Sequence, residues 1–258
     1  MQGKAAMFLR SDPRLYESRR KLEQQAKHVL GFASAKGGVG KTTLAVLAAL
    51  HLARMRFRVG LLDLDLTNPC THLLLGVEPR LDLVGEEAGI SPPKIAGIEY
   101  MTIAFFTGGK PLPLRGSEAT SAILEILAAT NWGQLDVLVI DFPPGIKDEI
   151  LDLSMIGGDN VKIVVVTTPS KLSVEAAKRL IDVARSEKLS ILGLVENMAD
   201  KPGLGKELAR QQRIEYLGHI PWDPDLEQSF GRPEKLVEGK AGKAMREVTE
   251  RLVKLLEG

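Results

Sequence analysis

The sequence predicts a single α/β domain in which one mostly parallel, twisted sheet carries helices on both faces. Short apolar runs alternate along the chain with amphipathic stretches, which is the pattern of a parallel sheet covered by helices. Runs such as VLVID (137–141) and IVVVTT (163–168) are apolar on both faces, as central parallel strands must be. The 258 residues contain no linker, internal repeat or low-complexity segment, so one domain is the economical interpretation.

The strands are predicted from short runs rich in Val, Ile and Leu that end at glycine, proline or polar residues. The first run, 29–34, leads into a glycine-rich turn, and the second, 59–64, ends in two aspartates. The third follows a proline-rich loop, and the fourth is closed by Phe-Pro-Pro-Gly. In chain order the predicted strands cover residues 29–34, 59–64, 99–106, 135–141, 161–168, 190–197 and 215–220.

Helices are predicted where apolar residues recur three and four positions apart between these runs. The predicted helices cover residues 41–55, 118–129, 173–187 and 244–256. An amphipathic helix such as 244–256 either docks on the sheet or binds a membrane surface, and in this fold we expect docking. Residues 1–27 are predicted to be an N-terminal extension, helical over 15–27, ahead of the α/β domain at 28–258.

Charge and cysteine content narrow the classes of function. Lys plus Arg number 34 against 33 for Asp plus Glu, so no basic excess predicts nucleic acid or an anionic membrane as a partner. The one cysteine, Cys70, excludes an intrachain disulfide, which favours a reducing, cytoplasmic compartment. The first residues lack the apolar core of a secretion signal, and no apolar run reaches membrane-spanning length. We therefore expect a cytoplasmic protein.

The most informative segment is SAKGGVGKTT, residues 34–43, which follows a predicted strand and begins a predicted helix. Its glycines let the backbone approach phosphate oxygens, and its amides together with the helix N-terminus favour an anion. Lys41 can reach the β- and γ-phosphates, the Thr42 hydroxyl suits Mg²⁺, and Thr43 can bond the α-phosphate. The sequence thus predicts ATP and Mg²⁺ as cofactors. The predicted phosphate-binding residues are Gly37, Gly38, Val39, Gly40, Lys41, Thr42 and Thr43.

Two strand ends supply carboxylates for the same site. Asp63 and Asp65 are two residues apart, so on a strand they would share one face. Asp141 ends a run of apolar residues, where a lone carboxylate is costly unless cations surround it. Its expected task is to accept hydrogen bonds from Mg²⁺-bound water or from Thr42. The predicted metal-site residues are Thr42, Asp63 and Asp141.

An extra lysine, Lys36, distinguishes this loop from ordinary phosphate loops. KGGVGKTT resembles the deviant loop of the MinD, ParA, Mrp and nitrogenase iron-protein superfamily. The resemblance implies a P-loop ATPase that forms a homodimer, in which Lys36 reaches the nucleotide of the partner subunit. It further implies that Asp65 positions or activates the attacking water and that Asp63 supports Mg²⁺ or its waters. Lys36, Lys41 and Asp65 are therefore the predicted catalytic residues, and we expect slow hydrolysis without a partner.

A predicted base site lies further along the chain. Asn197 ends a strand on the C-terminal side of the sheet, where open α/β sheets bind ligands. Its amide can pair with both the donor and the acceptor edge of adenine. By resemblance, the loop Pro221, Trp222 and Asp223 flanks the base. Trp222 would either stack on adenine or pack as a surface indole.

Longer segments resemble the Mrp type of iron–sulfur scaffold or carrier ATPase. The segments are WGQLDVLVIDFPPG, VVTTPSKLS, LGLVENMA and LGHIPWDP, and the resemblance runs from about residue 28 to the C-terminus. Mrp-type proteins typically carry Cys-x-x-Cys shortly after VENM, and two such pairs across a dimer hold a [4Fe–4S] cluster. The corresponding stretch here, ADKPGLGKELA, has no cysteine, and Cys70 would give a symmetric dimer two thiolates rather than four. Binding of an iron–sulfur cluster therefore stays open.

Three hypotheses about function follow. The first is a dimeric ATPase of Mrp type that assembles iron–sulfur or other metalloproteins and acts on a client apo-protein. The second is a positioning or partitioning ATPase like MinD or ParA. The third is a nucleotide-gated binding module without turnover. We favour the first.

Overall fold

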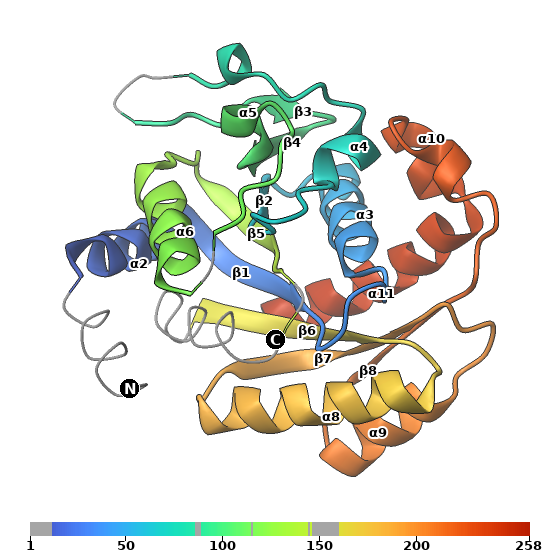
Figure 1. Ribbon diagram of the computed structural model, residues 1–258. Coiled ribbons are helices and arrows are strands. Elements are labelled where there is room, and N and C mark those ends of the chain that lie inside the picture. The colour runs from blue at the N-terminus through green and yellow to red at the C-terminus, as the bar shows by residue number, and fades with distance from the viewer. Residues whose placement is uncertain (1–11, 86–88, 115, 144, 146–159) are drawn as a thin grey trace.

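The computed structural model describes residues 12–85, 89–114, 116–143, 145 and 160–258. These residues form one eight-stranded sheet in the order β3-β4-β2-β5-β1-β6-β7-β8 (Figure 1). All neighbouring strands run parallel except β3, which pairs antiparallel with β4 at the sheet edge. The strands are β1 Ala26–Ala33, β2 Val59–Asp63, β3 Lys94–Ile95, β4 Ile98–Thr102, β5 Leu135–Asp141, β6 Val161–Thr167, β7 Ser190–Asn197 and β8 Tyr216–Ile220.

Helices cover both faces of this sheet, as the apolar strands require. Figure 1 shows α2, α6, α8 and α9 on one face and α3 and α11 on the other. Short helices α4 and α10 lie beside α3, and α5 follows β4. The bounds are α2 Pro13–Gln25, α3 Lys41–Arg54, α4 Thr71–Leu75, α5 Ala104–Thr107, α6 Ser117–Ala129, α8 Lys171–Ser186, α9 Leu204–Gln212, α10 Pro233–Glu238 and α11 Lys240–Glu257.

The N-terminal helix α2 packs on α6 and the start of β1. Asp12 caps it by accepting a hydrogen bond from the Arg14 amide at 2.9 Å. The buried Ser18 hydroxyl donates to the Leu124 carbonyl of α6 at 3.2 Å. The part of the predicted extension before residue 12 lies outside the described residues, and the division at residue 27 stays a prediction.

The predicted strand 99–106 is wrong over its second half. Strand β4 ends at Thr102, and Ala104–Thr107 forms the helix α5. The Thr102 hydroxyl accepts the Ala104 amide at 3.2 Å and so competes with the strand ladder. Gly108, with φ of 61°, then ends the helix in the left-handed region. The apolar run alone predicted a strand, because a four-residue helix is too short to show its own periodicity.

The C-terminal helix α11 docks on the molecule, as predicted. Its apolar side chains Met245, Val248, Leu252 and Leu256 are buried, and the helix contacts α3 and β8. At its start, the Gly242 carbonyl lies 2.7 Å from Nε2 of the buried His51 on α3. Within the described residues, none of the helices has the length and hydropathy that crossing a bilayer needs.

Gly242→Ala is expected to lower the free energy of unfolding by about 1–3 kcal/mol. A Cβ at this buried position would lie 2.3 Å from the Leu236 carbonyl oxygen and 2.5 Å from Val237 backbone atoms, so α10 and α11 must move apart. Urea unfolding measures the loss. The exposed neighbour Lys243→Ala is the control and should change stability by less than about 0.5 kcal/mol. Equal stability of both variants would contradict this close packing.

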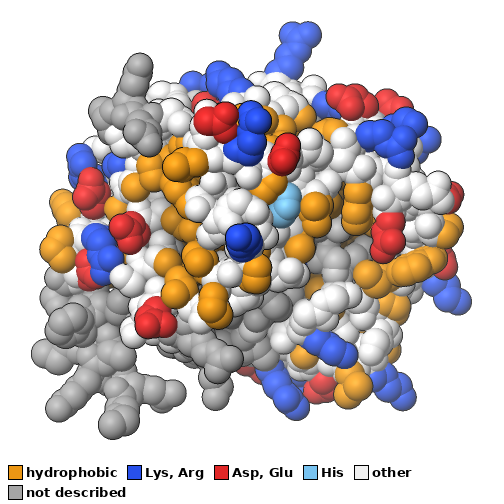
Figure 2. Space-filling model, turned by 45° about the horizontal axis from the view of Figure 1, so that its top comes forward, with side chains coloured by type: hydrophobic (Ala, Val, Ile, Leu, Met, Phe, Trp, Pro, Cys, Tyr) orange, Lys and Arg blue, Asp and Glu red, His pale blue; other side chains and the backbone are white. Residues whose placement is uncertain are grey.

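The face seen in Figure 2 carries basic and acidic side chains interspersed with hydrophobic ones. Among the described residues on that face no single-sign patch dominates, in agreement with the near-balance of 34 cationic and 33 acidic residues.

Candidate nucleotide-binding site

The glycine-rich loop joins the carboxyl end of β1 to the first turn of α3. Gly38 and Gly40 have φ of 76° and 81°, in the left-handed region that glycine reaches at no steric cost. The Ser34 hydroxyl donates to the Lys36 carbonyl at 3.1 Å and closes the loop from within. Gly37 and Gly38 are exposed, while Val39 is buried as the loop's apolar anchor. The loop therefore has the open, curved backbone that phosphate binding needs.

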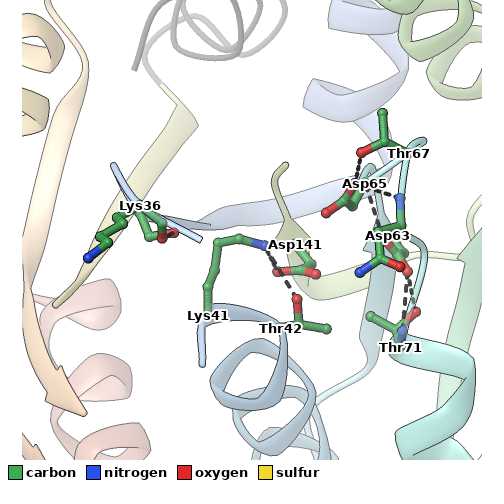
Figure 3. A network of polar contacts seen from close by, with 10 residues as sticks. Lys36, Lys41, Thr42, Asp63, Asp65, Thr67, Thr71 and Asp141 are labelled. Carbon is green, nitrogen blue, oxygen red and sulfur yellow. Dashed lines mark hydrogen bonds and ion pairs between the residues drawn. The ribbon is translucent and has the colours of Figure 1, made fainter. Parts of the chain in front are cut away.

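Lys41 and Asp141 form a buried ion pair at the base of this loop. The Lys41 Nζ lies 2.5 Å from Asp141 Oδ1, and the two side chains are 5% and 1% exposed. The Thr42 hydroxyl lies 3.5 Å from the same ammonium (Figure 3). Burial raises the pKa of Asp141, and Lys41 and Thr42 oppose that shift. The lysine and threonine predicted to hold phosphate and Mg²⁺ thus meet the carboxylate predicted to support them.

Asp63 lies beside Asp141, because the two residues are in register on the neighbouring parallel strands β2 and β5. Its carboxylate is fully buried and accepts hydrogen bonds from the Asp65 amide at 3.0 Å and the Thr71 hydroxyl at 2.6 Å. Burial, and after it the charge of Asp141, raise the pKa of Asp63 to about 7. A Mg²⁺ ion would favour the charged forms of both carboxylates, which fits a metal site.

Asp65 is located just beyond the end of β2. The prediction that Asp63 and Asp65 share one face of a strand is therefore wrong. Its Oδ1 accepts the Thr67 hydroxyl at 2.8 Å and the Asn68 amide at 3.0 Å, which closes a turn. The carboxylate is 8% exposed and lies on the same edge of the sheet as the phosphate loop (Figure 3). Asp65 is therefore held by the turn that follows β2, whereas Asp63 is held within the strand.

Lys36 is exposed, and Figure 3 shows its side chain pointing away from Lys41 and Asp141. Thr43 is half-buried in the first turn of α3, next to Thr42.

The predicted base-site residues lie at the ends of β7 and β8. The Asn197 amide donates to the Val39 carbonyl at 2.8 Å, so Asn197 touches the phosphate loop itself. Trp222 is 56% exposed, and Pro221 is half-buried. Asp223 accepts the Ala241 amide at 2.9 Å and so caps α11. The structure brings Asn197 to the phosphate loop, and it commits one oxygen of Asp223 to a helix cap.

Sequence reasoning missed a buried carboxylate beside Asn197. Glu196 accepts the amides of Gly203 and Gly205, both at 2.8 Å, and the Tyr216 hydroxyl at 3.1 Å. It thereby anchors the segment in which Mrp-type proteins carry their cysteines. An acidic residue inside the apolar strand LGLVEN was the available signal, because a buried charge must find donors.

Cys70 lies at the start of α4, partly buried. Burial, and after it the charge of Asp63, raise the pKa of its thiol, so the thiolate that binds metal is disfavoured. The described residues contain no cluster of three His, Cys, Asp or Glu side chains of the kind that holds a metal ion. The residues present therefore do not fit a [4Fe–4S] cluster held by this chain alone.

The pKa of Asp63 predicts a pH dependence of stability in the absence of Mg²⁺ and nucleotide. The folded-state pKa of about 7 exceeds the ordinary 3.8, so this group stabilises the fold fully below pH 3.8 and loses that contribution as pH rises to about 7. Between pH 5.5 and 8, the free energy of unfolding should fall by about 2 kcal/mol more in the native chain than in Asp63→Asn.

Urea unfolding at the two pH values checks this slope. Asp136→Asn is the control: Arg58 holds the pKa of Asp136 at about 2, so this carboxylate is charged throughout the range and its removal should leave the slope unchanged. Equal slopes for native chain and Asp63→Asn would contradict the raised pKa.

Comparison with known proteins places the chain in a family. The model of the ParA family described as NUBPL iron-transfer P-loop NTPase matches residues 25–256. The iron–sulfur cluster carrier protein of Saccharolobus solfataricus is 32% identical over 251 residues, covering 90% of this chain and 84% of that protein. The carrier protein of Methanocaldococcus jannaschii is 33% identical over 270 residues, covering 98% and 91%.

Solved structures agree with the predicted fold. The nucleotide-binding protein of Archaeoglobus fulgidus in complex with ADP matches with a TM-score of 0.70 and 29% identity, over 90% of this chain and 92% of that chain. The cell division ATPase MinD of Pyrococcus furiosus has a TM-score of 0.65 at 22% identity, over 88% and 99%, and shows the fold alone. The α/β prediction is confirmed, and the Mrp-type hypothesis is supported over the MinD-like one. The chain belongs to the ParA family of P-loop NTPases, in its NUBPL iron-transfer branch.

Proposed function

We propose that this chain is a Mg²⁺-dependent ATPase that acts in the assembly of iron–sulfur or other metalloproteins. The observation that carries the proposal is the Lys41–Asp141 pair at 2.5 Å beneath an open glycine loop. A buried carboxylate at this position holds the lysine at the base of the loop, where it can reach phosphate oxygens. The names of the archaeal relatives, iron–sulfur cluster carrier proteins, support the assembly role.

Each predicted residue has a task in this proposal. The amides of Gly37, Gly38, Val39 and Gly40 receive the phosphates, and Lys41 leaves Asp141 to bind the β- and γ-phosphate oxygens. Thr42 is a metal ligand, while Asp63 and Asp141 accept hydrogen bonds from the metal's waters. The metal neutralises charge on the phosphates when bound.

Asp65 orients the attacking water and accepts its proton, and Thr43 bonds the α-phosphate. Asn197 turns from Val39 to the adenine edge, where Pro221, Trp222 and Asp223 flank the base. Residues 1–27 act as an extension of the ATPase domain at 28–258. We place the protein in the cytoplasm.

Phosphate release with Mg²⁺ and with a chelator tests the ATPase. We expect turnover only with Mg²⁺ and at a slow intrinsic rate, because ordering of the catalytic lysine depends on dimerisation or on a client. No release at any protein concentration, together with intact ATP binding, would instead support a nucleotide-gated binding module.

The proposed enzyme is a homodimer in which Lys36 completes the partner's site. Support comes from its exposure and from its direction away from its own Lys41 (Figure 3). Lys36→Ala should lower kcat by roughly a hundredfold or more while ATP affinity stays within about threefold, since it removes a cation that acts on transition-state charge.

Mixing two inactive variants tests whether Lys36 acts across the dimer. In a mixture of Lys36→Ala and Asp65→Asn, a mixed dimer contains one site with both native residues if Lys36 acts on the partner. Random pairing should then restore about a quarter of the native rate. If Lys36 acted within its own subunit, the mixture would stay inactive.

The cargo is proposed to be held jointly with a client. One cysteine per chain gives a dimer two thiolates, so the client apo-protein must supply the other ligands of a cluster. Reconstitution with iron and sulfide, followed by absorbance, tests this with the dimer alone and with a cysteine-bearing client. Cluster absorbance in the dimer alone would contradict the shared site.

A further inference from the structure

Three buried polar side chains form a line behind the proposed metal site. The Thr71 hydroxyl lies 2.6 Å from Asp63 Oδ2, and the Tyr100 hydroxyl lies 2.7 Å from the Thr71 hydroxyl. All three residues are 0% exposed. They come from three separate elements, β2, α4 and β4. The tasks proposed above for hydrolysis use neither Thr71 nor Tyr100.

The direction of these hydrogen bonds follows from counting protons. An ionised carboxylate, the form that Mg²⁺ favours, only accepts, so the single proton of the Thr71 hydroxyl is then donated to Asp63. The Thr71 oxygen is then an acceptor, and the Tyr100 hydroxyl must donate to it. The chain of donation runs from Tyr100 through Thr71 to Asp63.

The sheet register places the tyrosine below the aspartate. In the β2–β4 pair, Leu61 is opposite Tyr100 and Asp63 is opposite Thr102. Alternate residues of a strand share a face, so Tyr100 and Thr102 face the same way as Asp63. The Tyr100 ring packs edge-on against Phe105, with centroids 5.3 Å apart and planes at 70°. This packing holds the hydroxyl in a dry interior, where an unmet hydrogen bond is costly.

Asp63 is held from three sides. Its Oδ2 receives the Thr71 hydroxyl and, at 3.3 Å, the Thr71 amide, while its Oδ1 receives the Asp65 amide at 3.0 Å. The last bond ties the carboxylate to the loop that carries Asp65. A rotation of the Asp63 carboxylate would therefore disturb both the proposed metal site and the proposed water-activating residue.

We propose that Thr71 and Tyr100 are positioning residues that orient the Asp63 carboxylate and so set the Mg²⁺ dependence of the ATPase. The proposal rests on the metal role given to Asp63 in the proposed function. Both residues act through Asp63. Loss of either hydroxyl leaves the phosphate loop and Lys41 in place but lets Asp63 rotate.

The expected result is a change in metal dependence without a matching change in saturated turnover. Tyr100→Phe keeps the packed ring and should raise the Mg²⁺ concentration for half-maximal phosphate release by about three- to tenfold, with kcat at saturating Mg²⁺ within about twofold. Thr71→Val should raise it further, because it removes the bond to the carboxylate itself. Thr71→Ser keeps the hydroxyl and should restore the native value.

The experiment measures phosphate release by the full chain against Mg²⁺ concentration at saturating ATP, together with the urea midpoint of each variant. Thr249→Val is the matched control, since this fully buried hydroxyl bonds the Met245 carbonyl of its own helix, at 2.8 Å. It should lose some stability and keep the native Mg²⁺ dependence.

A native Mg²⁺ dependence in both Tyr100→Phe and Thr71→Val would overturn the proposal and leave the two residues a purely structural role. Should Thr71→Val fail to fold, Tyr100→Phe decides between the positioning role and a purely structural role. A native chain that releases no phosphate with Mg²⁺ would overturn the proposed function itself, and the positioning role with it. The native measurement therefore separates the two failures.

Discussion

Lys41→Met is expected to weaken the binding of ATP with Mg²⁺ by about a hundredfold or more. The side chain stays unbranched but loses the charge that forms charge-assisted hydrogen bonds to phosphate oxygens, each worth about 1.5–3 kcal/mol. Calorimetry with MgATP measures the loss. The exposed Lys254→Met on α11 removes the same charge elsewhere and should keep the native affinity.

Lys41→Met also lowers the stability of the fold, and this effect must be separated from the loss of MgATP affinity. Without Lys41, the Asp141 carboxylate is 1% exposed and has lost its cation, a change that costs about 3–5 kcal/mol of stability. The double variant Lys41→Met/Asp141→Asn removes the stranded charge, so it should recover most of the stability and none of the affinity. Recovered affinity would mean that Lys41 only holds the fold, which would contradict the phosphate role.

Much of the site could be predicted because its chemistry is local in the chain. The segment from Ser34 to Thr43 carries its own strand end, glycines, lysine and helix start, so no distant residue is needed to define it. Asp141 was predictable for a related reason, since a carboxylate closing an apolar strand needs a cation, and Lys41 is the one that meets it.

The supporting residues behind the site could not be predicted in the same way. Tyr100 is linked to Asp63 through Thr71, because β4 pairs with β2 in one particular register. Thr71 meets Asp63 because α4 begins beside the end of β2. In the sequence, Tyr100 reads as one more core aromatic residue. Strand order and register are properties of the assembled sheet, and they decide which buried hydroxyl meets which carboxylate.

The contacts of the base-site residues could not be predicted from the sequence either. The position of Asn197 at a strand end follows from the sequence, but its bond to the Val39 carbonyl depends on how β7 lies beside the phosphate loop. Asp223 looked like a ligand-flanking residue, and its bond to the Ala241 amide depends on where α11 begins. Short polar side chains serve caps and ligands equally well, so the sequence pattern alone does not separate the two uses.

Asp65→Asn is expected to lower kcat by about a hundred- to a thousandfold while ATP affinity stays within about threefold. Loss of a positioned proton acceptor typically costs this much, and the phosphate loop that supplies the affinity is unchanged. The asparagine keeps an oxygen that can accept the Thr67 hydroxyl and the Asn68 amide, so the turn should survive. Single-turnover phosphate release with saturating MgATP measures the chemical step apart from product release.

The turn provides its own control for this prediction. Thr67→Val breaks the 2.8 Å bond to Asp65 Oδ1 and leaves the carboxylate itself intact. If Asp65 acts on water, Thr67→Val should slow the chemical step by less than about tenfold, far less than Asp65→Asn. Equal losses in the two variants would mean that Asp65 matters only as the acceptor that closes the turn. Because the asparagine preserves that turn while the valine weakens it, the two variants separate the carboxylate's chemistry from its architecture.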